Sequence, residues 1–354
     1  VIVSTTVADA NLETTGLIAQ YSLDGVTWVS STLRSVEVSS GAVVTSAGLI
    51  TGIDTGTGDI AMTLLWDIIV DLPDTADSTV YFRVIPADIA GVGATVTSGA
   101  FAVDTQIPST PAITTSAQTL NADTITIAGT AESEAIITIS GGASTATGTA
   151  TGGNYSISVS LTQNATNTLS VTAADLFSNT STPATVVIVE DSIAPNTPVI
   201  STSAQTLNAA TTTIAGTADA GTTITVSGGA STVTTTATGG NYSISVTLTQ
   251  DAVNTISVTA SDVAANTSTA ATVLITEDST APNVPVITTS AQTVDAAAID
   301  ITGTAESGAI ITISGGASTA TGTATGGNYS ISVPLTQDAA NTLSVTASDV
   351  AANT

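Results

Sequence analysis

Apolar and polar residues alternate in short runs along most of the chain. From Tyr155 to Leu161, every second residue is Tyr, Ile, Val or Leu, and each residue between them is serine. A period of two is typical of antiparallel strands with one face on a core and the other in water. Clusters such as Gly152-Gly153-Asn154 separate the runs and predict turns. The pattern predicts about seven strands per repeating unit and no helix of consequence.

The chain repeats itself every 87 residues, which is the spacing between the equivalent tyrosines Tyr155, Tyr242 and Tyr329. The segment ISGGASTATGTATGGNYSISV begins at Ile139 and recurs unchanged from Ile313. This period is close to the ~100 residues of an immunoglobulin-type (Ig-type) sandwich, too long for a solenoid repeat and too short for most enzyme domains. We therefore expect an all-β chain of tandem Ig-like or fibronectin-like sandwiches, arranged as an elongated rod. The clear repeats are predicted at residues 105–191, 192–278 and 279–354.

Residues 1–104 differ from the repeats but share their register near the end. They hold both tryptophans and both arginines, and Asp88 lies 87 residues before Asp175, an acid that recurs in the repeats. Tyr81–Val84 resembles the penultimate strand of an Ig-type or fibronectin-type sandwich. We therefore interpret residues 1–104 as a divergent domain of the same class.

The last repeat is expected to lack its final strand, because the sequence stops at Thr354, before the counterpart of Thr272–Thr276. One explanation is that the sequence is a fragment of a longer array. The other is that another chain supplies the strand. Val1-Ile2-Val3 resembles Val187-Ile188-Val189 near the end of an earlier repeat, and head-to-tail donation of such a strand would build a filament.

The balance of charge excludes several classes of partner. Two arginines and no lysine face 28 acidic residues, for a formal net charge of -26. Such a chain offers no cations to phosphates, so we expect it to bind neither nucleic acid nor anionic membranes. A hydrophobic content of 42% argues against disorder, and no apolar run is long enough to span a bilayer.

The residue types that most catalytic sites need are missing from the sequence. Histidine, cysteine and lysine are all absent, which excludes Ser–His, Cys–His and Schiff-base chemistry. Carboxylate pairs could in principle hydrolyse glycosides, but near-identical active sites in each repeat would be unusual. We therefore expect that the protein is not an enzyme.

Recurring acids are predicted to converge where neighbouring sandwiches meet. One set follows the apparent second strand, one precedes the final strand, and one closes each domain. Crowded carboxylates cannot all stay ionised without a cation, and a hard ion such as Ca²⁺ takes oxygen ligands. The candidate calcium ligands are Asp104, Glu132 and Asp175; Glu190, Asp191, Asp219 and Asp262; and Glu277, Asp278, Glu306 and Asp349. Asn179 or Asn266, backbone carbonyls and water could complete the shell. The alternative is that these acids are solvated loop residues.

Three longer motifs carry a resemblance to a known family. They are ITIAGTAESEAIITISGG, GGNYSISVSLTQNATNTLSVTAADLFSNTS and EDSIAPNTPVI. Residues 105–354 resemble the bacterial Ig-like repeats of large secreted and cell-surface adhesins. The resemblance implies an extracellular, cell-surface stalk, often stiffened by interdomain calcium. The chain departs from the family pattern where the usual glycine before asparagine is replaced by Ser178, Ala265 and Ala352.

These observations predict a structural stalk segment of a bacterial cell-surface adhesin, stiffened by calcium between its domains. The alternative is a subunit of a surface layer or extracellular filament, assembled by head-to-tail strand donation. In either case, the expected partners are neighbouring copies or further repeats of the same chain. The sequence does not identify an adhesion ligand.

Overall fold

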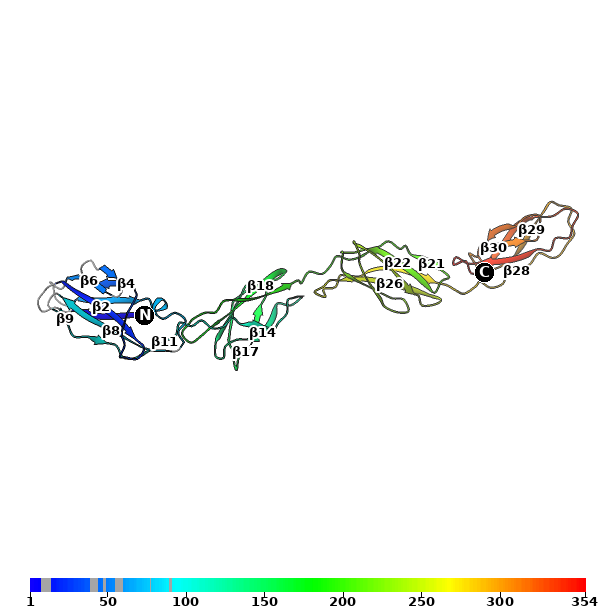
Figure 1. Cartoon of the computed structure of the whole chain (residues 1–354). Coiled ribbons are helices and arrows are strands. Elements are labelled where there is room, and N and C mark those ends of the chain that lie inside the picture. The colour runs from blue at the N-terminus through cyan, green and yellow to red at the C-terminus, as the bar shows by residue number, and fades with distance from the viewer. Residues whose placement is uncertain (8–13, 39–43, 47–48, 55–59, 77, 89–90) are drawn as a thin grey trace. The chain divides into compact units, whose positions relative to one another are not determined.

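Strands make up nearly all of the regular structure in the computed structural model (Figure 1). The model describes every residue except 8–13, 39–43, 47–48, 55–59, 77 and 89–90. Within the described part, the one helix is α1 (Ile68–Asp71), a single turn that is far too short to cross a membrane. The chain divides into two compact units, Val1–Gln118 with Ala122–Glu190 and Thr119–Asn121 with Asp191–Thr354. The prediction of tandem all-β sandwiches is confirmed.

The second repeat has the two sheets of an Ig-type sandwich. The three-stranded sheet has the order β20 (Val199–Ile200), β22 (Thr211–Thr217) and β25 (Asn241–Thr247). The five-stranded sheet has the order β21 (Gln205–Leu207), β27 (Ala271–Glu277), β26 (Ala252–Ser261), β23 (Thr223–Ser227) and β24 (Val233–Thr236). β21 runs parallel to β27, and the other pairs are antiparallel.

The first repeat has the same strands at the same spacing. They are β12 (Ala112–Ile113), β13 (Gln118–Leu120), β14 (Thr124–Thr130), β15 (Ile136–Ser140), β16 (Ala146–Thr149), β17 (Asn154–Ser160), β18 (Ala165–Ala174) and β19 (Ala184–Glu190). β12, β14 and β17 form one sheet, and β19, β18, β15 and β16 lie in that order in the other.

Six strands are described in the third repeat. Its strands are β28 (Val286–Ile287), β29 (Ala298–Thr304), β30 (Ile310–Ser314), β31 (Ala320–Thr323), β32 (Asn328–Pro334) and β33 (Ser344–Ser348). The sheet of β31, β30 and β33 has no counterpart of β21 or β27. β33 spans five residues, whereas the equivalent β26 spans ten.

The N-terminal domain is also a sandwich of two sheets. β1 (Ile2–Val7), β7 (Ile60–Trp66) and β4 (Leu33–Val38) form one sheet. The other contains β2 (Thr14–Ser22), β3 (Val29–Ser30), β5 (Val44–Ser46), β6 (Leu49–Asp54), β8 (Ser78–Asp88), β9 (Gly91–Val92), β10 (Val96–Thr97) and β11 (Phe101–Val103). Tyr81–Val84 lies in β8, which pairs with the domain's last strand, β11. Val1-Ile2-Val3 is paired with β7 of its own domain, where Ile2 lies opposite Leu65.

Each sandwich buries the apolar face that the alternation predicts. In β17, Tyr155, Ile157 and Val159 are buried, and the serines between them are exposed. In the N-terminal domain, Trp66 stacks on Tyr21 with the ring centroids 5.1 Å apart. With no disulfide in the chain, burial of apolar surface is the main source of stability.

The recurring tyrosines belong to the core, as the sequence predicts. In the second repeat, Tyr242 is buried and its hydroxyl donates to the carbonyl of Val199 at 3.2 Å. Gly216 lies against this contact, because a Cβ added there would be 1.9 Å from the Val199 oxygen. The hydrogen bond and the missing side chain together fix the short strand β20 against β22.

Candidate functional site

One aspartate in each repeat, directly after β18, β26 or β33, accepts hydrogen bonds that close its own loop. In the second repeat, Asp262 Oδ1 accepts the backbone N–H of Asn266 at 2.9 Å, and Oδ2 accepts Asn266 Nδ2 at 2.9 Å. Asp175 and Asp349 make the same two contacts with Asn179 and Asn353. These loops keep one geometry in all three repeats.

The residue before each of these asparagines takes a left-handed backbone conformation. Ser178, Ala265 and Ala352 have φ values of 70°, 68° and 67°. Glycine adopts this region without strain, whereas a residue with a Cβ does so at a cost of about 1 kcal/mol. The loss of the family's usual glycine therefore leaves the loop shape intact, because the aspartate hydrogen bonds hold it.

The same asparagines reach out of the loop to the linker that leads into the repeat. Asn266 Nδ2 donates to the carbonyl of Asp191 at 2.8 Å, and Asn353 Nδ2 donates to the carbonyl of Asp278 at 2.8 Å. In the first unit, Asn179 Nδ2 donates to the carbonyl of Asp104 at 3.0 Å. We call Asn179, Asn266 and Asn353 the junction asparagines. Each junction asparagine binds a backbone carbonyl that lies 75 positions earlier in the chain.

Two junction asparagines have a second asparagine as a partner. Within the second unit, Asn121 Nδ2 donates to Asn266 Oδ1, and Asn208 Nδ2 donates to Asn353 Oδ1. The sequence analysis missed Asn121 and Asn208. Both asparagines follow the motif Q-T-L and recur at the spacing of the repeats, and this recurrence could have marked them as candidates. The amides of Asn266 and Asn353 are thus bonded on both oxygen and nitrogen, and both residues are about 5% exposed.

The acids that close each domain make short turns at the start of the linkers. Asp104 Oδ1 accepts the N–H of Gln106 at 2.9 Å. Asp191 Oδ1 accepts the N–H of Ile193 at 3.1 Å, and Asp278 makes the equivalent contact with Thr280 at 3.3 Å. These carboxylates cap turns in the linkers.

The acids that follow the second strand lie after β14, β22 and β29. Asp219 Oδ2 accepts the N–H of the linker residue Asn196 at 2.8 Å, and this bond is the largest cause that lowers the pKa of Asp219. Glu132 and Glu306 occupy the equivalent position, where their carbonyls accept the amides of Ala135 and Ala309. The first turn after this strand is the same in each repeat.

Glu190 and Glu277 point into their own sandwiches. They are 1% and 2% exposed, at the ends of β19 and β27. Glu190 Oε2 accepts the N–H of Asn164 at 2.5 Å, and Glu277 Oε2 accepts the N–H of Asp251 at 2.7 Å. Each carboxylate thereby fixes a left-handed turn residue of its own repeat. Glu190 Oε1 is buried without a hydrogen-bond partner.

The printed contacts bring loop carboxylates to linker backbone and not to one another. Asn266 binds the carboxylate of Asp262 but only the backbone carbonyl of Asp191, whose own carboxylate accepts the N–H of Ile193. Among the described residues, no three acidic, histidine or cysteine side chains lie close enough to hold a metal ion. The donors fit a hard cation in kind, because all are oxygens. The arrangement by itself is a hydrogen-bonded clasp between a loop and a linker.

Comparison with known proteins identifies the repeats. A family model described as "Bacterial Ig domain" matches residues 108–191, 194–277 and 281–354, each within one of the predicted repeats. No curated protein sequence matches the chain.

Several solved structures are similar to this chain. A structure of a 1.5-MDa bacterial ice-binding adhesin is 23% identical, with a TM-score of 0.31, covering 67% of this chain and 90% of that one. The FN1–FN3 domains of chicken CNTN1 are 13% identical, with a TM-score of 0.31, covering 78% and 94%. Fibronectin(III)-like modules of CbhA from Clostridium thermocellum are 16% identical, with a TM-score of 0.35, covering 48% and 95%.

Proposed function

Because this chain belongs to the bacterial Ig-domain family, of which it carries three tandem copies, we propose that it is a structural stalk segment of a bacterial cell-surface adhesin. In this role the repeats provide length outside the cell, and a binding region elsewhere contacts the ligand. The partners of the segment are then further repeats of the same kind. We assign it no catalytic role, because its recurring acids are bonded to backbone and amide groups of loops and linkers.

The observation that carries this proposal is the repeated clasp at the junction asparagines. A spacer needs defined angles between its domains, and the usual expectation for domains joined by short linkers is relative motion. In the second unit, Asn266 and Asn353 each bond the linker carbonyl, the loop carboxylate and a second asparagine. A buried amide with all these partners resists displacement, because each broken bond leaves a desolvated polar group.

We further propose that Ca²⁺ adds to this stiffness. Two features support a cation at the junctions: the net charge of -26 and the purely oxygen donors of the linkers and loops. The residues that would hold it are the linker and loop acids, such as Asp191 with Asp262 and Asp278 with Asp349. Bound calcium would supply positive charge where the chain has none.

The test is small-angle X-ray scattering of the full chain in calcium and in chelator, combined with thermal melting. A stalk requires a monomer whose maximum dimension far exceeds that of one sandwich. A compact particle under both conditions would contradict the stalk. If the chain is extended under both conditions and calcium changes neither its dimensions nor its melting temperature, the stalk stands and the calcium proposal falls.

The second candidate is a subunit of a surface layer or extracellular filament. Such a subunit would be held by a strand that a neighbouring copy donates head to tail. The donor first suggested by the sequence, Val1-Ile2-Val3, is already paired in β1. Sedimentation across a range of concentrations separates the two candidates, since a filament subunit self-associates and a stalk segment does not.

A further inference from the structure

Each repeat carries the tripeptide Asn-Tyr-Ser at the start of the same strand. The asparagines are Asn154, Asn241 and Asn328, which begin β17, β25 and β32 and lie 87 residues apart. We call them the tip asparagines. Asn-x-Ser and Asn-x-Thr are the acceptor patterns for N-linked sugars. A chain rich in serine and threonine also produces such tripeptides by chance, so the structure has to separate usable acceptors from unusable ones.

The strand places both side chains that define the acceptor pattern in solvent. In β17, Asn154 and Ser156 are exposed, and Tyr155 between them is buried. Residues two apart in a strand share a face, so the amide and the hydroxyl lie on the same outer face. The same alternation begins β25 and β32, and all three strands lie at the edge of a three-stranded sheet. A transferase can therefore reach this segment in the folded protein.

A tight turn holds each tip asparagine clear of neighbouring atoms. Thr151 and Asn154 exchange backbone hydrogen bonds at 2.8 and 3.2 Å around Gly152 and Gly153, whose φ values are 57° and 79°. This geometry is typical of a two-residue hairpin turn of type I′. A Cβ added at Gly152 would meet no atom within 4 Å, and the equivalent glycines of the other two repeats are equally open. The space beside the amide is therefore large enough for a bulky group.

The amide of each tip asparagine keeps one hydrogen for a new bond. Asn154 Nδ2 donates to the carbonyl of Gly152 at 3.1 Å, and Asn241 and Asn328 make the equivalent bond at the same distance. This bond uses one of the two N–H groups of the amide. A sugar on the nitrogen would replace the other hydrogen and leave the turn intact.

The same tripeptide pattern at two junction asparagines is closed to a sugar. Asn266 Nδ2 donates to both the carbonyl of Asp191 and the carboxylate of Asp262. The hydroxyl residue of this tripeptide, Ser268, is 8% exposed and accepts a backbone N–H. The tripeptide at Asn179 is bonded in the same way. A sugar at either position would break the clasp.

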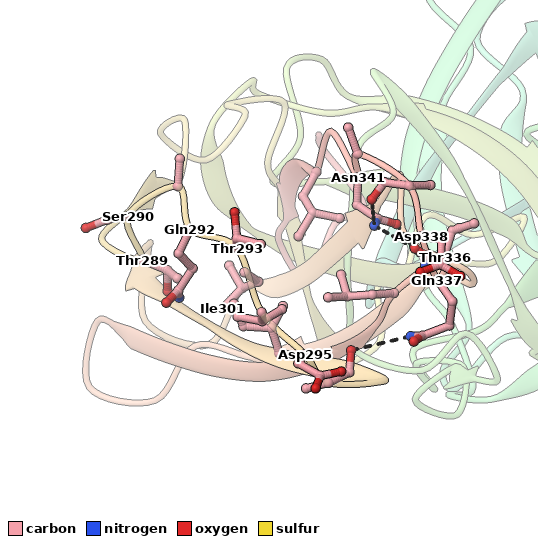
Figure 2. Close-up of a pocket in the computed structure, with 18 of the residues that line it drawn as sticks. Thr289, Ser290, Gln292, Thr293, Asp295, Ile301, Thr336, Gln337, Asp338 and Asn341 are labelled. Carbon is pink, nitrogen blue, oxygen red and sulfur yellow. Dashed lines mark hydrogen bonds between the residues drawn. The ribbon is translucent and has the colours of Figure 1, made fainter.

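Other asparagines lack the extended geometry or the free amide. Asn164 also begins an acceptor tripeptide, but its φ of 52° places it in a left-handed turn before β18. Asp251 and Asp338 hold the equivalent positions in the other repeats, so this tripeptide does not recur. Figure 2 shows an engaged amide in the third repeat, where Asn341 donates to the carbonyl of Thr336 at 3.1 Å. The tip asparagines combine exposure, space and recurrence.

We propose that the tip asparagines accept an N-linked sugar after the repeats have folded. The donor is a sugar activated as a diphosphate at its anomeric carbon. Nδ2 forms a bond to this carbon as the bond from the carbon to the diphosphate oxygen breaks. The diphosphate leaves with the electron pair, and the nitrogen gives one proton to a base of the transferase. Each repeat then carries one hydrated, uncharged group on an exposed turn, where proteases prefer to cut. This inference does not depend on the stalk proposal, because it uses the hairpin alone.

The first experiment maps sugars on the full chain purified from the organism that makes it. The protein is cleaved at acidic residues, because it has two arginines and no lysine, and mass spectrometry assigns each site. Cleavage after Glu134 and Glu306 separates the identical segments around Asn154 and Asn328. We expect sugar on the three tip asparagines and none on the junction asparagines. A single sugar unit identifies a nucleoside diphosphate donor, and a preassembled oligosaccharide identifies a lipid diphosphate donor.

A variant made in the same organism tests the acceptor pattern within one chain. Ser243→Ala removes the hydroxyl of one tripeptide and leaves Asn241 and its turn unchanged. Sugar should be lost from Asn241 and kept on Asn154 and Asn328, which serve as internal controls. Bare tip asparagines in the parent, sugar on Asn266, or sugar retained on Asn241 in the variant would each overturn the proposal.

A second experiment needs no transferase. The chain has no cysteine, so Asn241→Cys and Asn266→Cys each provide one thiol for reaction with N-iodoacetylglucosamine. The melting temperature of each variant is compared before and after the sugar is attached. We expect no shift for Asn241→Cys and a decrease for Asn266→Cys. A decrease of the same size in both would show that the turn has no room for a sugar, and the proposal would fail.

Discussion

Replacing Asn266 with alanine tests the clasp most directly. The change removes the donor to the Asp191 carbonyl and the acceptor of the Asn121 amide, which both act on the linker side. It also removes the bond from the side-chain amide to Asp262 Oδ2, which acts within the second repeat. The backbone bond from Asn266 to Asp262 Oδ1 is retained, so the loop keeps one of its two ties.

The magnitude follows from counting these bonds. Two neutral hydrogen bonds at about 1 kcal/mol each place the loss of clasp stability near 2 kcal/mol. This corresponds to a roughly 30-fold shift from the clasped to the open junction. The bond to Asp262 involves a charged acceptor, so the second repeat itself should lose about 1.5 kcal/mol of unfolding free energy. The substitution should therefore lower both the stability of the clasp and the unfolding free energy of the second repeat. These two losses can be measured separately.

The assay is a distance distribution between two spin labels, one in each neighbouring repeat. The chain has no cysteine, so Ser156→Cys and Ser243→Cys create two unique and exposed labelling sites. We expect a narrow distribution in the parent and a broad one in Asn266→Ala. The matched control is Asn254→Ala, which removes three side-chain bonds within the second repeat and none at the linker. It should lower the melting temperature and leave the distribution narrow.

Two results would refute the reasoning. The first is an unchanged distribution in Asn266→Ala while circular dichroism shows the repeats folded. The second is a parent distribution already as broad as that of the variant, since the clasp would then not order the junction in solution.

Three further substitutions probe the second repeat. Gly216→Ala should destabilise it by about 3 kcal/mol or more in chemical denaturation, because the new Cβ would collide with the Val199 carbonyl and the Tyr242 hydroxyl. Burial raises the pKa of Tyr242. The buried phenol therefore contributes fully to the free energy of unfolding below pH 10, and this contribution is lost as the pH rises through the pKa of the folded protein. Tyr242→Phe should reduce the loss of stability at alkaline pH. The hydrogen bond from the N–H of Asn196 lowers the pKa of Asp219. The ionised carboxylate therefore contributes to the free energy of unfolding above pH 3.8, and this contribution is lost as the pH falls through the pKa of the folded protein. Asp219→Asn should remove this part of the loss of stability at acid pH.

Controls for these variants lie in the same repeat. Gly239→Ala places a Cβ where no atom lies within 4 Å, so it should cost only the strain of its φ of 57°, about 1 kcal/mol. Equal losses for the two glycine variants would contradict the collision argument. Melting curves that shift in parallel at every pH, with no change of slope, would contradict both titration predictions.

Local pattern was enough to predict the strands, the repeats and their cores. Alternation with a period of two is a property of neighbouring residues, so the burial of Tyr155, Ile157 and Val159 could be predicted without any knowledge of distant contacts. The recurrence at 87 residues predicted the repeats, because identical segments fold in the same way.

Only the tertiary structure decided what the recurring acids contact. The direction of Glu277 depends on the N–H of Asp251, and the role of Asn266 depends on a carbonyl 75 positions earlier and an amide 145 positions earlier. A carboxylate on a strand end or in a loop can face solvent, a metal or a buried donor with the same local sequence. Which of these it meets is set by the groups that folding brings to it from distant parts of the chain.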